Sequence, residues 1–242
     1  MTEVKLVTVW DRTVRVFHWV NFLCVLGLIV VGTVILNAGT LGIPNDGKIL
    51  LKSVHVLIGY VFALNLLWRL VWAFVGGRHA RWRAILPGGR GYVGELRGYL
   101  SRLGSGRQGQ YLGHNPLGRI AIFLLLLLLL NQAVTGLVLA GTDLFYPPLG
   151  SWIAGWIAAA GVDPATLVPY APEMYEETAY QAMRAFRKPF ITAHYYGFYT
   201  LLVLITLHIL AVVVTEVRED GGLVSAMFTG KKAISAPPAD RD

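Results

Sequence analysis

Residues Thr192–Val214 read TAHYYGFYTLLVLITLHILAVVV, an apolar stretch that contains His194 and His208. Their separation in sequence brings both imidazoles to within about 40° of one helix face, about 21 Å apart along the axis. A bilayer core is about 30 Å thick, so we expect one histidine near each side of it. Histidine inside a membrane span is costly and usually functional. The pair indicates axial ligands for two stacked haems; the alternative is hydrogen bonding to neighbouring spans.

The composition is that of a membrane protein with several spans. The 242 residues are 55% hydrophobic and 14% charged, whereas soluble chains average about 25% charged. The net charge of +7 comes from arginines concentrated in one loop, and the chain has no basic–aromatic groove pattern, so we expect no nucleic acid partner. Cys24 is the one cysteine. It excludes a paired-cysteine haem attachment, so any haem should be non-covalent, of b type.

Hydropathy predicts an all-α membrane protein, a bundle of four transmembrane helices. The predicted spans are about residues 14–36, 50–75, 119–140 and 191–217. We expect residues 1–220 to form one transmembrane domain, followed by a polar and disordered cytoplasmic tail at 221–242.

Arginines between the second and third spans set the expected orientation. The positive-inside rule places that loop in the cytoplasm, and with four spans both termini are then cytoplasmic too. The loop at 141–190, which contains acids and aromatics, should face the periplasm of a bacterial inner membrane. Its apolar segment Leu149–Ala160 is too short to span, and we expect a helix lying along the membrane surface.

Two further histidines fall inside the predicted spans, His18 in the first and His55 in the second. The topology puts His18 at the depth of His208 and His55 at the depth of His194, so each pair could bracket one haem iron. Two matched pairs are harder to explain as helix packing than four unrelated residues. Because bis-histidine ligation leaves no open position on iron, we expect two haems that transfer electrons.

The charged and small residues near the histidine pairs could either contact haem or have an ordinary structural role. Possible propionate contacts, or equally solvated charges, are Arg12, Arg15 and Lys188. Arg69 should snorkel to the cytoplasmic side. Asn131 and Gln132 are expected to form hydrogen bonds between helices. Glycines that could make room for haem, or serve ordinary helix packing, include Gly27, Gly32, Gly59, Gly136 and Gly197.

Several motifs within about residues 8–218 resemble bacterial di-haem cytochromes of the b-561 type. The motifs are Val9–Arg12, Arg15–Trp19, His55-x-x-x-Gly59, Gly113–Arg119 and His194-x13-His208. This superfamily includes the cytochrome b subunits of nickel–iron hydrogenases, the gamma subunits of formate dehydrogenases and thiosulfate reductase relatives. The resemblance implies a four-helix bundle, two b haems, and electron exchange between a partner protein and membrane quinone.

We therefore expect a membrane cytochrome that links a periplasmic redox protein, either a hydrogenase-like subunit or a c-type cytochrome, to ubiquinone or menaquinone. One alternative is a stand-alone quinone oxidoreductase that uses a small oxidant or reductant such as superoxide. Another is a haem-free transporter or structural bundle. Intramembrane acid pairs, which a proton-coupled transporter usually needs, are absent from the predicted spans.

A quinone site is expected where the third span enters the membrane on the cytoplasmic side, at His114, Asn115 and Gly118. This turn resembles the quinone-contacting turn of the formate dehydrogenase relatives. Asn115 can donate to a quinone carbonyl, and Gly118 lets a ring approach the backbone. The alternative is that Asn115 and Pro116 simply begin a helix, as cap and first residue.

Overall fold

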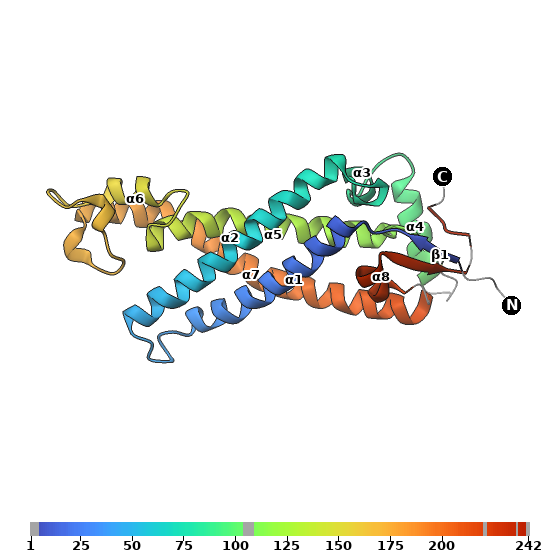
Figure 1. Cartoon of the computed structure of the whole chain (residues 1–242), viewed down its shortest axis with the longest axis horizontal. Coiled ribbons are helices and arrows are strands. Elements are labelled where there is room, and N and C mark those ends of the chain that lie inside the picture. Colours follow the sequence, from blue (N-terminus) through green and yellow to red (C-terminus); the bar gives the residue numbers. More distant parts are fainter. Residues whose placement is uncertain (1–4, 104–108, 220–221, 236, 241–242) are drawn as a thin grey trace. The chain divides into compact units, whose positions relative to one another are not determined.

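The computed structural model describes residues 5–103, 109–219, 222–235 and 237–240. Among these, four helices are long and apolar enough to cross a membrane (Figure 1). They are α1 (Arg12–Leu36), α2 (Asn45–Val75), α5 (Pro116–Leu144) and α7 (Glu177–Glu219). The prediction of a mostly helical chain with four spans is thus confirmed.

Shorter elements occupy the connections. The helices are α3 (Trp82–Ile85), α4 (Tyr92–Leu103), α6 (Gly150–Ile157) and α8 (Leu223–Thr229), with 3₁₀ turns at Arg78–Ala80, Pro164–Thr166 and Pro172–Met174. Two strands, β1 (Lys5–Thr8) and β2 (Lys231–Ile234), mean that the described chain is not purely α. Its contacts divide it into two compact units, and each long helix contributes to both.

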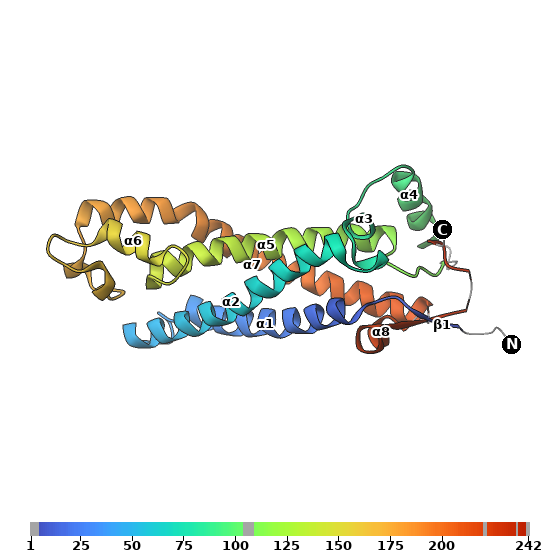
Figure 2. The ribbon, with the colours of Figure 1, turned by 45° about the horizontal axis from the view of Figure 1, so that its top comes forward.

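Unit 1 comprises residues 1–19, 66–128 and 200–242. In it, β1 pairs antiparallel with β2, so that Lys5 lies opposite Ile234 and Thr8 opposite Lys231 (Figure 2). Ala226 of α8 is fully buried in an apolar cluster that includes Trp10. The prediction of a disordered tail is therefore wrong for its described residues. A strand partner far away in sequence orders the tail, which its polar composition could not indicate.

Unit 2 comprises residues 20–65 and 129–199. The segment expected to be helical, Leu149–Ala160, contains α6, whose Ile153 and Ile157 are completely buried against Tyr175 and Met183. Both ribbon views show α6 beside the first turns of α7.

This packing places the beginning of α7 at Glu177, well before the predicted start of the span at residue 191. Pro189, which falls near the end of the loop expected at 141–190, lies inside α7. Proline removes one helical hydrogen bond and disfavours the preceding turn. Met183, which lies in the buried cluster with α6, gives the extra turns of α7 tertiary contacts that offset this cost.

Candidate haem sites

His55 of α2 and His194 of α7 meet within unit 2. Their ring centroids are 6.3 Å apart and the ring planes are inclined by 73°. A metal ion between the two rings would lie about 2 Å from one nitrogen of each ring. These two bonds, together with the distance from each ring centroid to its nitrogen, account for the separation of the centroids. The spacing therefore suits one metal ion held between the rings.

Glycines on the other two spans border these imidazoles. A Cβ at Gly32 of α1 would lie 3.2 Å from Cε1 of His55, and one at Gly136 of α5 would lie 3.4 Å from Cε1 of His194. By contrast, a Cβ at Gly59 would meet nothing within 4 Å. Two of the expected glycines thus make room beside histidines, and Gly59 does not.

Thr135 of α5 orients His194. Its hydroxyl donates to the carbonyl of Asn131 at 2.6 Å and lies 2.8 Å from Nδ1 of His194. Because the single hydroxyl proton goes to Asn131, the threonine oxygen accepts from Nδ1–H. This hydrogen bond selects the tautomer in which Nε2 carries a free lone pair, the form that ligates a metal.

Replacing Thr135 with valine keeps the shape and removes this acceptor. We expect the variant to bind haem at His55–His194 about 10- to 100-fold more weakly. This is the usual loss of affinity when a residue that hydrogen-bonds a metal-ligating histidine is removed. The measurement is haem content after titration of the purified protein with haem. Thr206→Val, which removes a hydroxyl that donates to the carbonyl of Leu202 within α7, should leave binding unchanged. Equal loss in both variants would contradict the orienting role.

Asn131 and Gln132 form the expected hydrogen bonds between helices. Asn131 Nδ2 donates to the carbonyl of Ala193 at 3.2 Å, and Gln132 Nε2 donates to that of His194 at 3.0 Å. A Cβ at Gly197 would lie 2.6 Å or less from both amides. Gly197 therefore serves this α5–α7 contact rather than a haem.

His18 of α1 and His208 of α7 lie in unit 1, where His208 is close enough to act electrostatically on His18. The His18 ring packs edge-on against Trp19, with centroids 5.5 Å apart. Nδ1 of His18 and Nδ1 of His55 are buried and have no hydrogen-bond partner among the described residues. The structure thus brings His55 and His194 together and places His18 and His208 in the same unit.

The three expected propionate contacts have different surroundings. Arg12 and Lys188 are exposed. Arg15 hydrogen-bonds through its guanidinium to the carbonyl of Phe228 in α8, within unit 1. Trp19 Nε1 donates to the carbonyl of Met227 at 3.1 Å, so two consecutive α8 carbonyls receive bonds from α1.

At the turn before α5, both ends of the Asn115 carboxamide are engaged. Oδ1 accepts from the backbone N–H of Gly118 at 2.7 Å, and Nδ2 donates to the hydroxyl of Tyr99 at 2.9 Å. A Cβ at Gly118 would lie 3.1 Å from Oδ1. These contacts support the helix-start reading of Asn115, with Gly118 making room for the cap.

The neighbouring His114 differs, because its Nδ1 is buried without a partner among the described residues. Burial, followed by the positive charges of Lys232 and Arg69, lowers the pKa of His114 to about 3. The neutral ring has one nitrogen that can accept a hydrogen bond, and Nδ1 is available for that role. Lys232, from β2, donates to the carbonyls of Tyr111 and Gly113 in the same turn.

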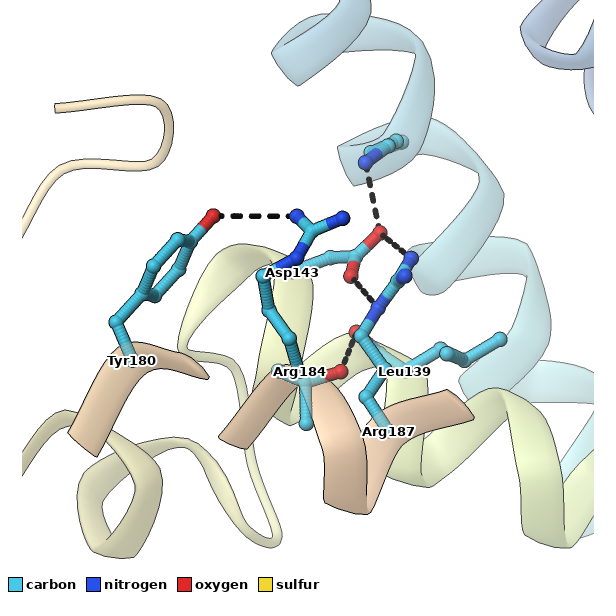
Figure 3. A network of polar contacts seen from close by, with 7 residues as sticks. Leu139, Asp143, Tyr180, Arg184 and Arg187 are labelled. Atoms are coloured by element: carbon cyan, nitrogen blue, oxygen red, sulfur yellow. Dashed lines mark hydrogen bonds and ion pairs between the residues drawn. The ribbon is translucent and has the colours of Figure 1, made fainter. Parts of the chain in front are cut away.

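Sequence reasoning missed an ion cluster in unit 2 (Figure 3). Asp143 of α5 accepts from Lys52 of α2 at 2.7 Å and from Arg187 of α7 at 2.6 and 3.0 Å. All three side chains are less than a quarter exposed. Lys52 precedes His55 by one helical turn and Arg187 precedes His194 by two. The sequence shows this spacing of the two cations from the histidines. It does not show that α5 brings Asp143 between them.

A family model described as prokaryotic cytochrome b561 matches residues 9–230. Similar proteins carry the name of probable Ni/Fe-hydrogenase B-type cytochrome subunits. The one from Rhizobium leguminosarum bv. viciae is 26% identical over 95% of this chain and 90% of its own length. That from Rhodobacter capsulatus is 27% identical, with 94% and 82% covered. One from Escherichia coli K12, a hydrogenase 1 subunit by name, is 32% identical, with 54% and 59% covered. No solved structure matches the chain.

Proposed function

Because the chain belongs to the prokaryotic cytochrome b561 family, we propose that it carries electrons between a redox protein and membrane quinone through two b haems. Membership itself makes it a multi-pass membrane protein that binds haem b and transfers electrons, so the haem-free alternative does not apply. Bound haem supplies one-electron chemistry, and the chain positions it. The observation that carries the proposal is the His55–His194 pair, with ring centroids 6.3 Å apart.

In this proposal His18 and His208 hold the second haem. Each pair would hold one haem through two imidazoles, and haem bound in this way would supply electron transfer rather than oxygen chemistry. The orphaned Nδ1 atoms of His18 and His55 and the free Nε2 of His194 fit ligation by neutral imidazole. Glycine beside each ring of the His55–His194 pair leaves space that a bulkier residue would fill.

The orientation we propose is that of the positive-inside rule in a bacterial inner membrane, with the arginine-rich connection between α2 and α5 in the cytoplasm. The β1–β2 pairing supports this, because it joins the two terminal regions within one unit. Both termini are then cytoplasmic, and α6 with its connections faces the periplasm.

The redox partner is proposed from the relatives, which are named as hydrogenase cytochrome subunits. A hydrogenase-like protein on the periplasmic side would deliver electrons to the haem at His55–His194. The exposed Trp152 of α6 supports a docking surface in that region, since aromatic side chains are enriched at interfaces.

Copurification tests this function. A tagged chain extracted in mild detergent should retain a metal-containing redox protein, and hydrogen or another donor of that partner should reduce both haems. Replacing Trp152 with Asp should weaken retention without changing haem content. The periplasmic partner is wrong if the chain retains no partner, or if crosslinks to a retained partner fall only on the arginine-rich connection.

For quinone we propose a site at the turn before α5, centred on His114. Neutral His114 offers Nδ1 to a quinol hydroxyl, while Asn115 holds the turn in place as the helix cap. If electrons arrive from the periplasm and protons from the cytoplasm, quinone reduction at this turn would charge the membrane.

The prediction is that His114→Phe slows oxidation of the reduced haems by a soluble quinone at least tenfold, because the acceptor is lost, while both haem spectra stay intact. Asn115→Leu should slow it as well, since it removes a cap that contributes about 1 kcal/mol. Asn115→Asp retains an oxygen that can cap and serves as the control. Unchanged quinone kinetics in His114→Phe would remove the support for this site.

A further inference from the structure

Arg69 of α2 is a buried cation within a membrane-spanning helix. Only 6% of its surface is exposed, so it does not snorkel to the cytoplasmic side as its sequence position indicates. The reason is tertiary. Its guanidinium lies over the ring of Phe17, 5.9 Å from the centroid, a cation–π contact that keeps the side chain between α1 and α2 within unit 1.

No described residue accepts a hydrogen bond from Arg69 or forms an ion pair with it. The carboxylate of Asp11 acts on it electrostatically, but both Asp11 oxygens are engaged elsewhere. Oδ1 accepts from the N–H of Val14 at 2.8 Å, and Oδ2 accepts from Nε1 of Trp72 at 3.0 Å.

Burying a cationic side chain is costly unless an anion or several acceptors accompany it. The other buried cation of unit 1 differs, because Lys232 donates to two carbonyls. Among the described residues of unit 1, Arg69 thus lacks the acceptors that Lys232 has.

The position of Arg69 identifies the ligand. Phe17, whose ring Arg69 contacts, immediately precedes His18. The Asp11–Trp72 and Phe17–Arg69 contacts show α1 and α2 running antiparallel here, which sets Arg69 at the level of Phe17 and His18. A b haem carries two propionates at one edge. The planar guanidinium fork matches a carboxylate with two parallel hydrogen bonds.

We propose that Arg69 binds a propionate of the haem held by His18 and His208. This inference rests on the proposed function, because it needs a haem at that pair. The residue proposed here to contact a propionate is buried, unlike the cations that the sequence suggests. Of the expected cations in this unit, Arg12 is exposed and Arg15 is bonded to the carbonyl of Phe228.

The test compares Arg69→Met with the wild-type chain in purified, haem-loaded protein. Methionine keeps an unbranched apolar stem and removes the charge and all donors. Redox titration followed by the haem spectrum should show a lower midpoint potential for one haem, because a lost positive charge favours the ferric form. That haem should pass to apomyoglobin at least about tenfold faster, the scale of a charge-assisted hydrogen bond. The other haem should keep both properties.

Three further variants make the result decisive. His18→Leu identifies which redox component belongs to the His18–His208 haem. Arg69→Lys keeps the charge without the fork, so the potential should stay near that of the wild type while haem release accelerates. It also covers the case in which Arg69→Met fails to fold. Arg83→Met removes an exposed positive charge from the same unit and should change neither measurement.

The proposal is overturned if Arg69→Met and Arg69→Lys match Arg83→Met in both measurements, or if their effects fall on the haem that survives in His18→Leu. Failure of the underlying function has a different signature. In that case the wild-type chain would itself lack a second haem, or His18→Leu would retain both.

Discussion

Replacing His208 with leucine should remove one b-haem signal completely and leave the other intact, which halves the haem content. Leucine fills a similar volume but offers no lone pair, so the chain would lose one of the two imidazoles proposed to hold this haem. His208 and His18 lie in one compact unit, and His55 and His194 in the other. Loss of one haem should therefore not propagate to the second pair. The measurement is a reduced-minus-oxidised spectrum with haem quantified per chain.

The matched controls come from the other three histidines. His18→Leu should remove the same spectral component as His208→Leu, and the double variant should remove nothing more. His55→Leu and His194→Leu should each remove the other component. Different components lost in His18→Leu and His208→Leu would show that the pairing is wrong. A fully loaded wild-type chain with one haem would refute the di-haem proposal itself.

Replacing Asp143 with alanine should produce the largest loss of stability among single substitutions outside the haem ligands. The carboxylate joins three helices through Lys52 and Arg187. Its removal leaves two positive side chains close together, each about a fifth exposed. Breaking a buried ion pair by removing one partner costs about 3–5 kcal/mol. Residual exposure places the expected cost near the lower end. Thermal unfolding of the detergent-solubilised protein measures it.

Asp143→Asn separates charge from shape. The amide can still accept hydrogen bonds, but it no longer neutralises the two cations, so we expect most of the loss to remain. Glu173→Ala, which removes an exposed carboxylate of the same unit, should change the unfolding temperature little. Adding Lys52→Met to Asp143→Ala should recover part of the loss, because contacting residues are not additive. A wild-type unfolding temperature in Asp143→Ala would contradict this role of the cluster.

The four spans and the depths of their histidines could be predicted from the sequence, because these features are local. A run such as Leu124–Leu130 is apolar whatever packs against it, and bilayer thickness sets the length needed to cross. Helical periodicity then places His194 and His208 on one face. The hydrogen bonds of Asn131 and Gln132 were predictable for a related reason, since amides within a span must find partners.

Tertiary structure alone decided which polar groups pair and where α7 begins. Arg69 is buried because Phe17 of another helix receives it, and Asp143 joins cations that are 44 and 91 positions away in the chain. The tail is ordered because β1 pairs with it, and α7 begins early because Met183 packs with α6. Each of these outcomes depends on the free energy of contacts between distant segments. Composition and periodicity describe only a residue's neighbours in the chain, so they could not predict them.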